Sequence, residues 1–148
     1  MQQKQIIVDV SHSSQQVVRD VLSISQRPLV VSHTGFYGHC HSPRNIPDEL
    51  MQAIAEQGGL IAVGYWDGAV CDINPQSIAA AIRYGIELVG VDHIALGSDF
   101  DGATTTALDT SELVQLTQAL IAEGLNQQQI SAVMGGNSLR LLQNNLPD

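Results

Sequence analysis

Four short, continuous apolar runs constrain the fold of this chain more than any other feature of its sequence. They are Ile6-Ile7-Val8, Leu29-Val30-Val31, Leu60-Ile61-Ala62-Val63 and Ile94-Ala95-Leu96. A strand with one face in water alternates apolar and polar residues, whereas a strand covered on both faces is apolar throughout, as in a parallel sheet. The runs therefore predict buried parallel strands near residues 5–11, 29–32, 60–65 and 93–98.

The segments between and after these runs have the period of amphipathic helices. Each opens on residues that favour a helix start, namely Ser13 or Ser14, Pro47, Asn74 with Pro75, Asp109 with Glu112, and Asn126 with Gln129. We expect Gly135-Gly136-Asn137 to kink or break the last helix. The leucines that follow this break, Leu139, Leu141 and Leu142, are expected to close the core.

Strands and helices alternate along the chain and give four consecutive β/α units. The predicted class is α/β, in one domain over residues 1–148. Four such units are half of a (β/α)8 barrel of the TIM type. An open four-stranded sheet is the alternative, but it leaves the apolar first and last strands as unpaired edges. Such edges would require a second copy, a missing half or a further covering element.

Composition limits the kinds of molecule that the chain is expected to bind. A net charge of −9 with only six Lys and Arg argues against nucleic acid or a membrane surface, because both are bound through basic patches. No apolar run reaches the ~20 residues of a membrane span. Met1 to Gln5 shows no export signal, so we expect a cytoplasmic protein with Cys40 and Cys71 as reduced thiols. A small molecule, a metal ion or another protein remains as partner.

Polar residues follow the predicted strands at their carboxyl ends. The first strand leads to Asp9 and His12, the second to His33, and the fourth to Asp99 and Asp101. In a barrel these ends share one face, so we expect both histidines and a carboxylate to converge. Imidazole and carboxylate groups are the ligands of Zn²⁺ in hydrolytic sites. Either histidine alone could be a hydrogen-bonded loop residue, and it is the pair that favours the ligand interpretation.

Other polar residues near these ends have competing interpretations. Asp99 is nearer the strand and is assigned the chemical role, whereas Asp101 is expected to be a turn residue before Gly102. Arg44 follows a histidine-rich loop and could bind a substrate carboxylate or form a surface salt bridge. We expect loop or structural roles for the remaining histidines, His39, His41 and His93.

Five segments occur in a specific order and spacing over nearly the whole chain. They are Val8 to Ser13, Pro28 to His33, Arg44 to Asp48, Gly90 to Gly102, and Gly135 to Arg140. In this order they resemble the membrane (renal) dipeptidase family.

The resemblance implies a zinc-dependent (β/α)8 hydrolase that cleaves dipeptides at a binuclear metal site. By position, His12 and His33 resemble the two histidines that bind one zinc ion of the pair. Arg44 resembles the arginine that receives the terminal carboxylate of the substrate. Asp99 resembles the aspartate that contacts the substrate and moves the proton.

The family's amino-terminal half supplies a His-x-Asp pair, a bridging glutamate and a further substrate-binding histidine, and these have no counterpart here. We therefore expect the chain to be a partial domain, the carboxyl-terminal half of a dipeptidase barrel with half of the site. Its partners would be a dipeptide and either an amino-terminal half-barrel chain or a second copy of itself. A non-catalytic half-barrel that serves as an oligomerisation or binding module is the alternative. An unrelated barrel metallohydrolase such as a phosphatase ranks last, because it would need more basic groups than Arg44.

Overall fold

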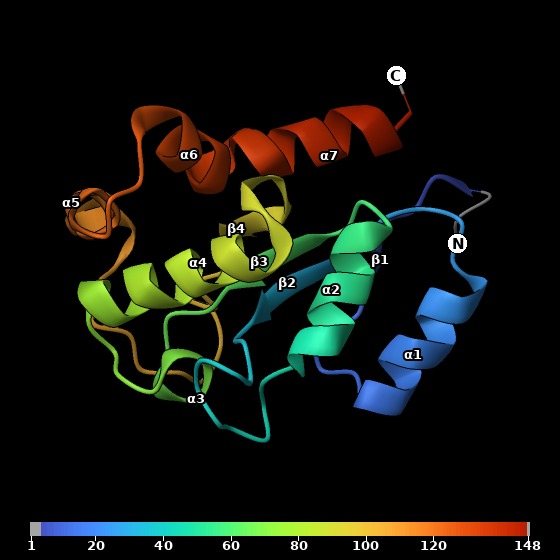
Figure 1. Cartoon of the computed structure of the whole chain (residues 1–148), viewed down its shortest axis with the longest axis horizontal. Coiled ribbons are helices and arrows are strands. Elements are labelled where there is room, and N and C mark those ends of the chain that lie inside the picture. The colour runs from blue at the N-terminus through green and yellow to red at the C-terminus, as the bar shows by residue number, and fades with distance from the viewer. Residues whose placement is uncertain (1–3, 148) are drawn as a thin grey trace.

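A four-stranded parallel sheet forms the centre of the computed structural model, which describes residues 4–147 (Figure 1). Its strands lie side by side in chain order, as β1 (Val8–Asp9), β2 (Leu29–Thr34), β3 (Leu60–Val63) and β4 (Ile94–Leu96). The predicted α/β class with consecutive β/α units is confirmed. The described residues exclude Met1 to Gln3 and Asp148. Part of the expectation that the chain has no export signal depends on Met1 to Gln3.

Three helices pack against one face of this sheet: α1 (Gln15–Ile24), α2 (Asp48–Glu56) and α4 (Pro75–Val89). They begin at the predicted positions, because the Ser14 hydroxyl accepts the Val17 N–H and the Asn74 side chain accepts the Ser77 N–H. The core between helices and sheet includes Val18, Leu22, Val31, Met51, Ile54, Ile61, Ile78, Ile82 and Ile94.

The pairing of β2 with β3 shifts near the carboxyl end of β2. Val31 pairs with Ile61 and Thr34 with Val63, so three steps along β2 match two steps along β3. An extra residue of this kind bends the strand locally and changes the direction of its side chains. The shift falls at Ser32 and His33, and therefore affects how β2 presents its histidine.

A short helix that the sequence pattern does not predict, α3 (Asp67–Val70), follows β3. Cys71 at its end forms a disulfide with Cys40 in the loop after β2. The expectation of two reduced thiols is therefore wrong. The two cysteines are 31 residues apart in sequence, but their Cα atoms are 5.6 Å apart, because adjacent parallel strands send their following loops out at the same end of the sheet.

Before β4 the chain makes the short turn η2 (Val91–His93), and after β4 it is mostly helical. The later elements are η3 (Thr110–Glu112), α5 (Leu113–Ala122), α6 (Gln127–Ser131), η4 (Ala132–Gly136) and α7 (Asn137–Asn145). Helix α5 packs against α4. Both predicted capping pairs are present, at Asp109 with Glu112 and at Asn126 with Gln129. The predicted break also occurs, because non-helical backbone at Gly135 separates α6 from α7.

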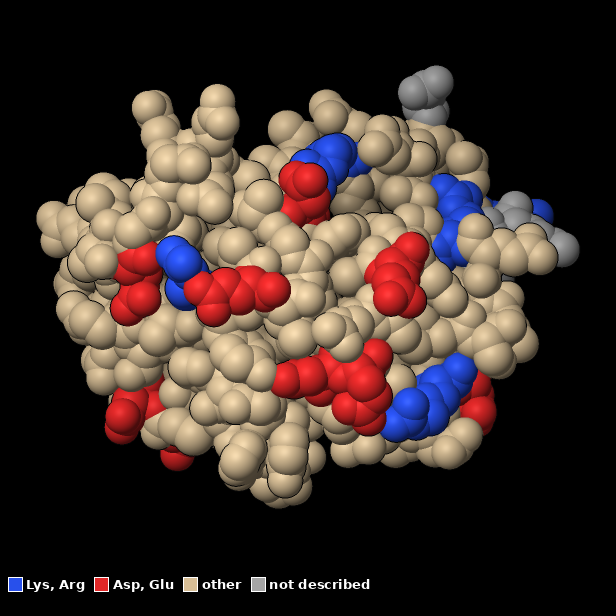
Figure 2. Space-filling view, viewed as in Figure 1, with Lys and Arg blue, Asp and Glu red and all other residues tan. Residues whose placement is uncertain are grey.

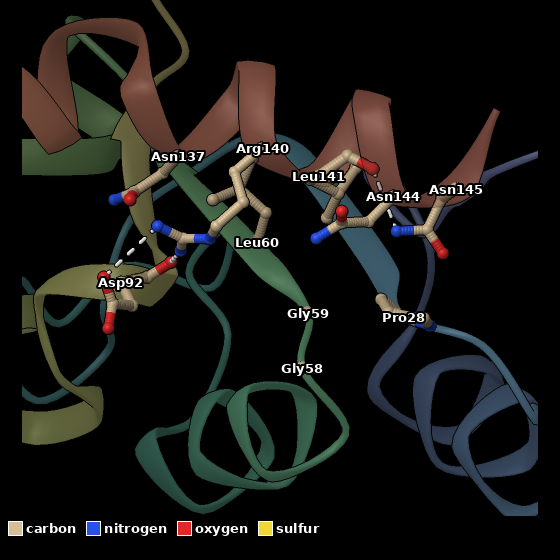
Figure 3. Close-up of a pocket in the computed structure, with 10 residues that line it drawn as sticks. All are labelled: Pro28, Gly58, Gly59, Leu60, Asp92, Asn137, Arg140, Leu141, Asn144 and Asn145. Atoms are coloured by element: carbon tan, nitrogen blue, oxygen red, sulfur yellow. Dashed lines mark hydrogen bonds and ion pairs between the residues drawn. The ribbon is translucent and has the colours of Figure 1, made fainter. Parts of the chain in front are cut away.

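Helix α7 crosses the amino-terminal ends of the strands (Figure 3). The Asn137 side chain donates from Nδ2 to the carbonyls of Val91 and Ile94, at 2.7 and 2.8 Å. At the other end of the helix, Arg27 donates to the Asn145 carbonyl at 2.6 Å. Both ends of α7 are thus fastened to the segments that lead into the strands.

Only one of the three leucines of α7 that were expected in the core is buried there. Leu141 joins a second, smaller apolar cluster with Leu60, Ala62 and Ala95. Leu139 and Leu142 are 57% and 42% exposed, so the expectation is wrong for these two. A helix has 3.6 residues per turn, so side chains one or two positions from Leu141, such as those of Leu142 and Leu139, point in other directions.

The surface carries acidic groups in several separate places. On the face in Figure 2, basic groups mostly lie beside acidic ones and form no continuous area among the residues described. The ion pairs are Arg19–Glu49, Arg83–Glu87 and Arg140–Asp92. Over residues 4–147, no helix has both the length and the apolar character needed to cross a bilayer.

Candidate functional site

His12 and His33 meet beyond the carboxyl ends of β1 and β2. Their Nε2 atoms are 2.8 Å apart, and their rings lie edge to face with centroids 4.8 Å apart. His12 has a φ of 61°, a left-handed conformation that is uncommon for a residue with a side chain. Such backbone concentrates at functional sites, where the surrounding structure holds it in place. The structure thus brings the two predicted ligands to one point.

A hydrogen-bond network fixes the strand ends that carry these histidines. One carboxylate oxygen of Asp9 accepts the N–H groups of Ser11 and Ser32, at 2.9 and 3.2 Å. The two serine hydroxyls are 3.0 Å apart, and that of Ser11 also accepts the His33 N–H at 3.3 Å. Burial alone would raise the pKa of Asp9, but the bonds from Ser32 and Ser11 outweigh it and lower the pKa. Asp9 is therefore ionised at neutral pH and links β1 to β2.

The ring of His33 is oriented by two neighbours. The Ser32 hydroxyl lies 3.0 Å from His33 Nδ1. A hydrogen bond at one ring nitrogen selects the tautomer in which the other nitrogen can face a metal ion. Trp66, which follows β3, lies against the same imidazole with ring centroids 6.0 Å apart. These contacts leave Nε2 as the atom directed at His12.

Arg44 lies beside His12 and has no carboxylate partner within residues 4–147. Its Nη2 atom is 3.4 Å from His12 Nε2, and its guanidinium carbon is 5.7 Å from the centre of the Trp66 ring. The surface salt bridge that the sequence allowed is therefore not formed in the described part of the chain. The guanidinium of Arg44 is half-buried against an aromatic ring, and its planar set of N–H donors is of the kind that binds an anion.

A hollow of about 470 Å³ opens between the histidines and the turn after β4. Like His12, Asp99 has left-handed backbone, with a φ of 57°. Its carbonyl accepts bonds from the Gly102 N–H and the Thr104 hydroxyl, both at 3.0 Å, which closes the turn. Asp101 stands in this turn, as expected, and lines the hollow as well. The lining consists of His12, Ser32, His33, Leu96, Gly97, Ser98, Asp99 and Asp101.

The other histidines lie away from this hollow. His93 lies at the amino-terminal end of the sheet, where its Nδ1 is 2.8 Å from the carbonyl that precedes β3. His41 stacks on Tyr37, and His39 lies against Tyr84. Burial lowers the pKa of His39, which keeps it neutral at pH 7. These positions agree with the loop and structural roles that the sequence predicts.

Sequence reasoning missed Ser11, Ser32 and Trp66. Both serines directly precede a candidate ligand, in Ser11-His12 and Ser32-His33, and this repeated pair was a usable signal. Trp66 follows the third strand, so its place at the same end of the sheet was also available. Its contacts with Arg44 and His33 depend on the folded loops and have no counterpart in the sequence.

The histidine pair fits a metal ion as two of its ligands. Two Zn–N bonds of about 2.0 to 2.1 Å at a tetrahedral angle separate the nitrogen atoms by about 3.3 Å. The observed 2.8 Å needs only a small parting of the rings to reach this value. Within the described residues, no group of three or more His, Cys, Asp or Glu could hold an ion. A catalytic zinc has three protein ligands, so the two histidines alone would not complete such a site.

His12, His33 and Asp99 line one hollow at the carboxyl ends of parallel strands, and Arg44 lies beside His12. Proteins of the β/α-barrel class carry their functional groups at this face. The family model of the membrane dipeptidases, peptidase family M19, matches residues 1–146. The chain belongs to this family, and the resemblance seen in its sequence motifs is confirmed.

Individual relatives agree with this assignment. The chain is 33% identical over 144 residues to dipeptidase ataJ of Aspergillus terreus, a match that covers 92% of this chain and 35% of the relative. It is 35% identical over 145 residues to dipeptidase aclJ of Aspergillus oryzae, covering 93% and 34%. The chain thus spans about a third of the length of these two relatives.

The fold matches a crystal structure of a metallopeptidase from Rhodobacter sphaeroides liganded with a phosphinate mimic of the dipeptide L-Ala-D-Ala. The TM-score is 0.89 and the sequence identity 26%, over 96% of this chain and 43% of that one. The described β/α units therefore have the arrangement of a part of this barrel-type fold.

Proposed function

We propose that this chain takes part in zinc-dependent hydrolysis of dipeptides, supplying half of a binuclear metal site and the arginine that binds the substrate carboxylate. The observation that carries the proposal is the convergence of His12, His33 and Arg44 beyond two adjacent strands. His12 Nε2 lies 2.8 Å from His33 Nε2 and 3.4 Å from Arg44 Nη2. Membership of the dipeptidase family and the dipeptide mimic held by the Rhodobacter sphaeroides enzyme support this reaction.

His12 and His33 would hold one zinc ion through their Nε2 atoms. When bound, zinc supplies Lewis-acid polarisation of the scissile carbonyl and a nucleophile at neutral pH. The protein's own contribution is orientation. Asp9 and the two serines hold both strand ends at a fixed separation, and the Ser32 hydroxyl keeps the His33 ring turned so that Nε2 faces the hollow.

Arg44 would bind the terminal carboxylate of the substrate through its guanidinium fork. Because its Nη2 atom is next to His12 Nε2, a carboxylate bound there lies close to the metal ligands. The scissile bond of a dipeptide is only one residue away from that carboxylate. A fixed, short distance between the two groups would select short substrates and orient them for attack.

Asp99 would hold and pass the proton that the leaving amine requires. Its carboxylate lies on the wall of the hollow that also contains both histidines. A carboxylate placed in this way can take a proton from water and return it to the departing nitrogen. The turn that ends at Gly102 fixes the backbone of Asp99 during this transfer.

The remaining zinc ligands would come from the amino-terminal half that other members of the family have. This half would be part of the same polypeptide or a separate half-barrel chain. Strands β1 and β4 are the outer strands of the sheet, so each can pair with a further strand. A second copy of this chain would close the sheet as well, but it would add another His12 and His33 without a new kind of ligand.

Zinc content and hydrolysis of a dipeptide panel test the proposal, with the chain alone and with an amino-terminal half-barrel of the family added. We expect bound zinc and hydrolysis when both halves are present. In a His12→Ala, His33→Ala double variant we expect loss of hydrolysis and of one zinc ion of the pair. His41→Ala is the matched control, because His41 lies outside the hollow. Absence of hydrolysis in both conditions would overturn the proposed activity.

A further inference from the structure

The loop between β2 and α2 carries Arg44 but contains little regular structure. Phe36 and Ile46 form an isolated bridge at its base, and turns fill the chain between them. The Arg44 N–H bonds to the Ser42 hydroxyl at 3.3 Å, within the same loop. Backbone bonds within the loop also hold it, such as those from the Cys40 N–H to the Phe36 carbonyl and from the Asn45 N–H to the Ser42 carbonyl. Attachments from outside the loop decide where this turn places Arg44 relative to the rest of the site.

Two attachments fasten the loop to α3 and its end. Cys40 forms the disulfide with Cys71, directly after α3. Asn45, which is 3% exposed, donates from Nδ2 to the carbonyls of Cys40 and Ala69, at 2.9 and 3.0 Å. Cys40 precedes Arg44 in the chain and Asn45 follows it. Both sides of the Arg44 segment are thus tied to one short helix.

The aromatic ring beneath Arg44 is held at the start of the same helix. Trp66 directly precedes α3 and is 6% exposed. Its indole lies against Gly64 and Gly68, and a Cβ atom at Gly68 would come within 2.8 Å of the indole nitrogen. Helix α3 therefore positions both the ring and the loop that places Arg44 over it.

We propose that the Cys40–Cys71 disulfide is a positioning element for Arg44, and that its reduction weakens capture of the substrate carboxylate while leaving the metal ligands in place. This rests on the proposed function, in which Arg44 binds that carboxylate. The network between β1 and β2 holds the backbone that carries the histidines without using this loop, and the Ser32 hydroxyl fixes the His33 ring from the same network. Arg44 and Trp66 touch the imidazoles only from the outside, so the two parts of the site can be separated. Displacement of a binding group by about 1 Å is enough to weaken substrate capture strongly.

The redox step is ordinary thiol–disulfide exchange. Cys71 is exposed and Cys40 is 2% exposed, so a dithiol attacks the Cys71 sulfur and releases the Cys40 thiolate. The second thiol then frees Cys71, and the dithiol leaves as a disulfide. In total the S–S bond gains two electrons and two protons and becomes two thiols. The Asn45 bond to the Ala69 carbonyl and the contact of Cys40 Sγ with the Asp67 carbonyl at 3.9 Å then remain between the loop and α3.

Steady-state kinetics with the amino-terminal half supplied test the proposal on oxidised, reduced and Cys71→Ala protein. We expect KM for a dipeptide to rise about tenfold in the reduced and variant forms, with kcat within about twofold, since ground-state capture is what weakens. Reoxidation of the wild-type protein should restore KM. Cys71 is the residue to change because it is exposed, so its truncation leaves no buried cavity.

Trp66 gives a second measurement that does not depend on hydrolysis, because it is the only tryptophan in the chain. We expect its fluorescence emission to shift in the Cys71→Ala variant, since Arg44 no longer stays on the ring. The shift should be absent when Arg44→Met is the starting protein. Zinc content, measured on the same samples, should not change with the disulfide. A merely structural disulfide would lower the melting temperature without this dependence on Arg44.

Either of two results would overturn the positioning role. One is an unchanged KM with unchanged Trp66 emission after the disulfide is removed. The other is an emission shift of the same size in the Arg44→Met background. If hydrolysis is absent in every form, it is the proposed function that fails, and the emission comparison still decides whether the disulfide holds Arg44 in place.

Discussion

The two ends of the sheet are built on different principles. At the amino-terminal end, Asn137 ties α7 to two backbone carbonyls, and Arg140 pairs with Asp92. At the carboxyl end, His12 and Asp99 adopt left-handed backbone, and two imidazole nitrogens meet at 2.8 Å. Uncommon conformations persist only where the surrounding structure holds them. Both ends thus carry bonds that hold the fold, but the described residues at the carboxyl end also bring together side chains of the kinds that bind metal ions.

Each end also has a hollow, and size does not tell which one is functional. The hollow under α7 has about 260 Å³ (Figure 3), and the described residues that line it include no histidine. Its charged groups, Asp92 and Arg140, neutralise each other. The hollow at the carboxyl end joins two histidines with two aspartates. Of the two hollows, only the second brings imidazole and carboxylate groups together, the kinds of side chain that bind zinc and transfer protons in enzymes.

The largest effect is expected from removing both candidate ligands, His12→Ala with His33→Ala. Without them one zinc ion of the proposed pair is not retained, so hydrolysis with the other half supplied should fall by about a thousandfold or more. The free energy of unfolding should change little, because His12 is exposed and His33 is only half-buried. Metal analysis, hydrolysis and urea unfolding measure the three quantities. A large loss of stability would show that the carboxyl end also supports the fold.

Asp99→Asn should lower kcat by about 10² to 10⁴, the usual range for loss of a general acid or base. Asparagine is also one of the residues most tolerant of left-handed backbone, so the turn and its stability should be preserved. Hydrolysis kinetics and urea unfolding of the same preparation test both statements. An unchanged kcat would remove Asp99 from the proton pathway.

Asn137→Ala should affect the opposite end of the sheet. It removes one donor from each of the carbonyls of Val91 and Ile94, of which the Val91 carbonyl still accepts the Ile94 N–H, and the loss should be about 2 kcal/mol of unfolding free energy. Asn144→Ala is the matched control on the same helix, since Asn144 is exposed, and should stay within about 0.5 kcal/mol of wild type. Zinc content should be unchanged. If zinc were lost together with stability, the two ends would not be independent.

Local signals in the sequence predicted most of the fold correctly. Helix starts depend on a side chain reaching N–H groups within the next turn, so Asn74 could be recognised from its neighbours alone, and the first helix start could be limited to Ser13 or Ser14. Continuous apolar runs also located the strands, because burial on both faces removes the usual alternation. The prediction of burial is wrong for the first run, where Ile6 is 50% exposed and the strand spans only Val8–Asp9. The meeting of His12 and His33 followed from parallel strands ending at one face.

Features that depend on contacts between distant segments were missed or predicted wrongly. The small number of cysteines and the expected compartment favoured reduced thiols, but Cys40 and Cys71 form a disulfide. This bond depends on two loops that leave adjacent strands at the same end of the sheet. Leu139 and Leu142 were placed in the core because they are leucines, although the direction of α7 buries only Leu141. No local pattern reports the direction in which a helix packs.

Arg44→Lys tests whether the guanidinium fork at the carboxyl end is needed for substrate capture. Lysine keeps the charge but lacks the planar fork, so KM should rise about 10- to 100-fold with little change in kcat. Arg19→Lys is the control, because Arg19 lies in an exposed ion pair with Glu49. Initial rates over a range of dipeptide concentrations give both constants. If kcat fell and KM did not, Arg44 would act on the reaction step rather than on substrate capture.

The smallest effect is expected from Asp9, which links β1 to β2 below the histidines. The pKa of Asp9 is lower in the folded chain than in the unfolded one, so its ionised form stabilises the fold. This stabilisation is fully present at pH values above the pKa of the unfolded chain, about 3.9. It is lost as the pH falls through the pKa of the folded chain. Asp9→Ala should therefore be slightly less stable than wild type between pH 5 and 8 and nearly equal to it in strong acid. Urea unfolding of both proteins over a pH series measures the difference. A difference that stays constant into strong acid would mean that the Asp9 side chain stabilises the strand ends by packing, because hydrogen bonds to its carboxylate must weaken on protonation.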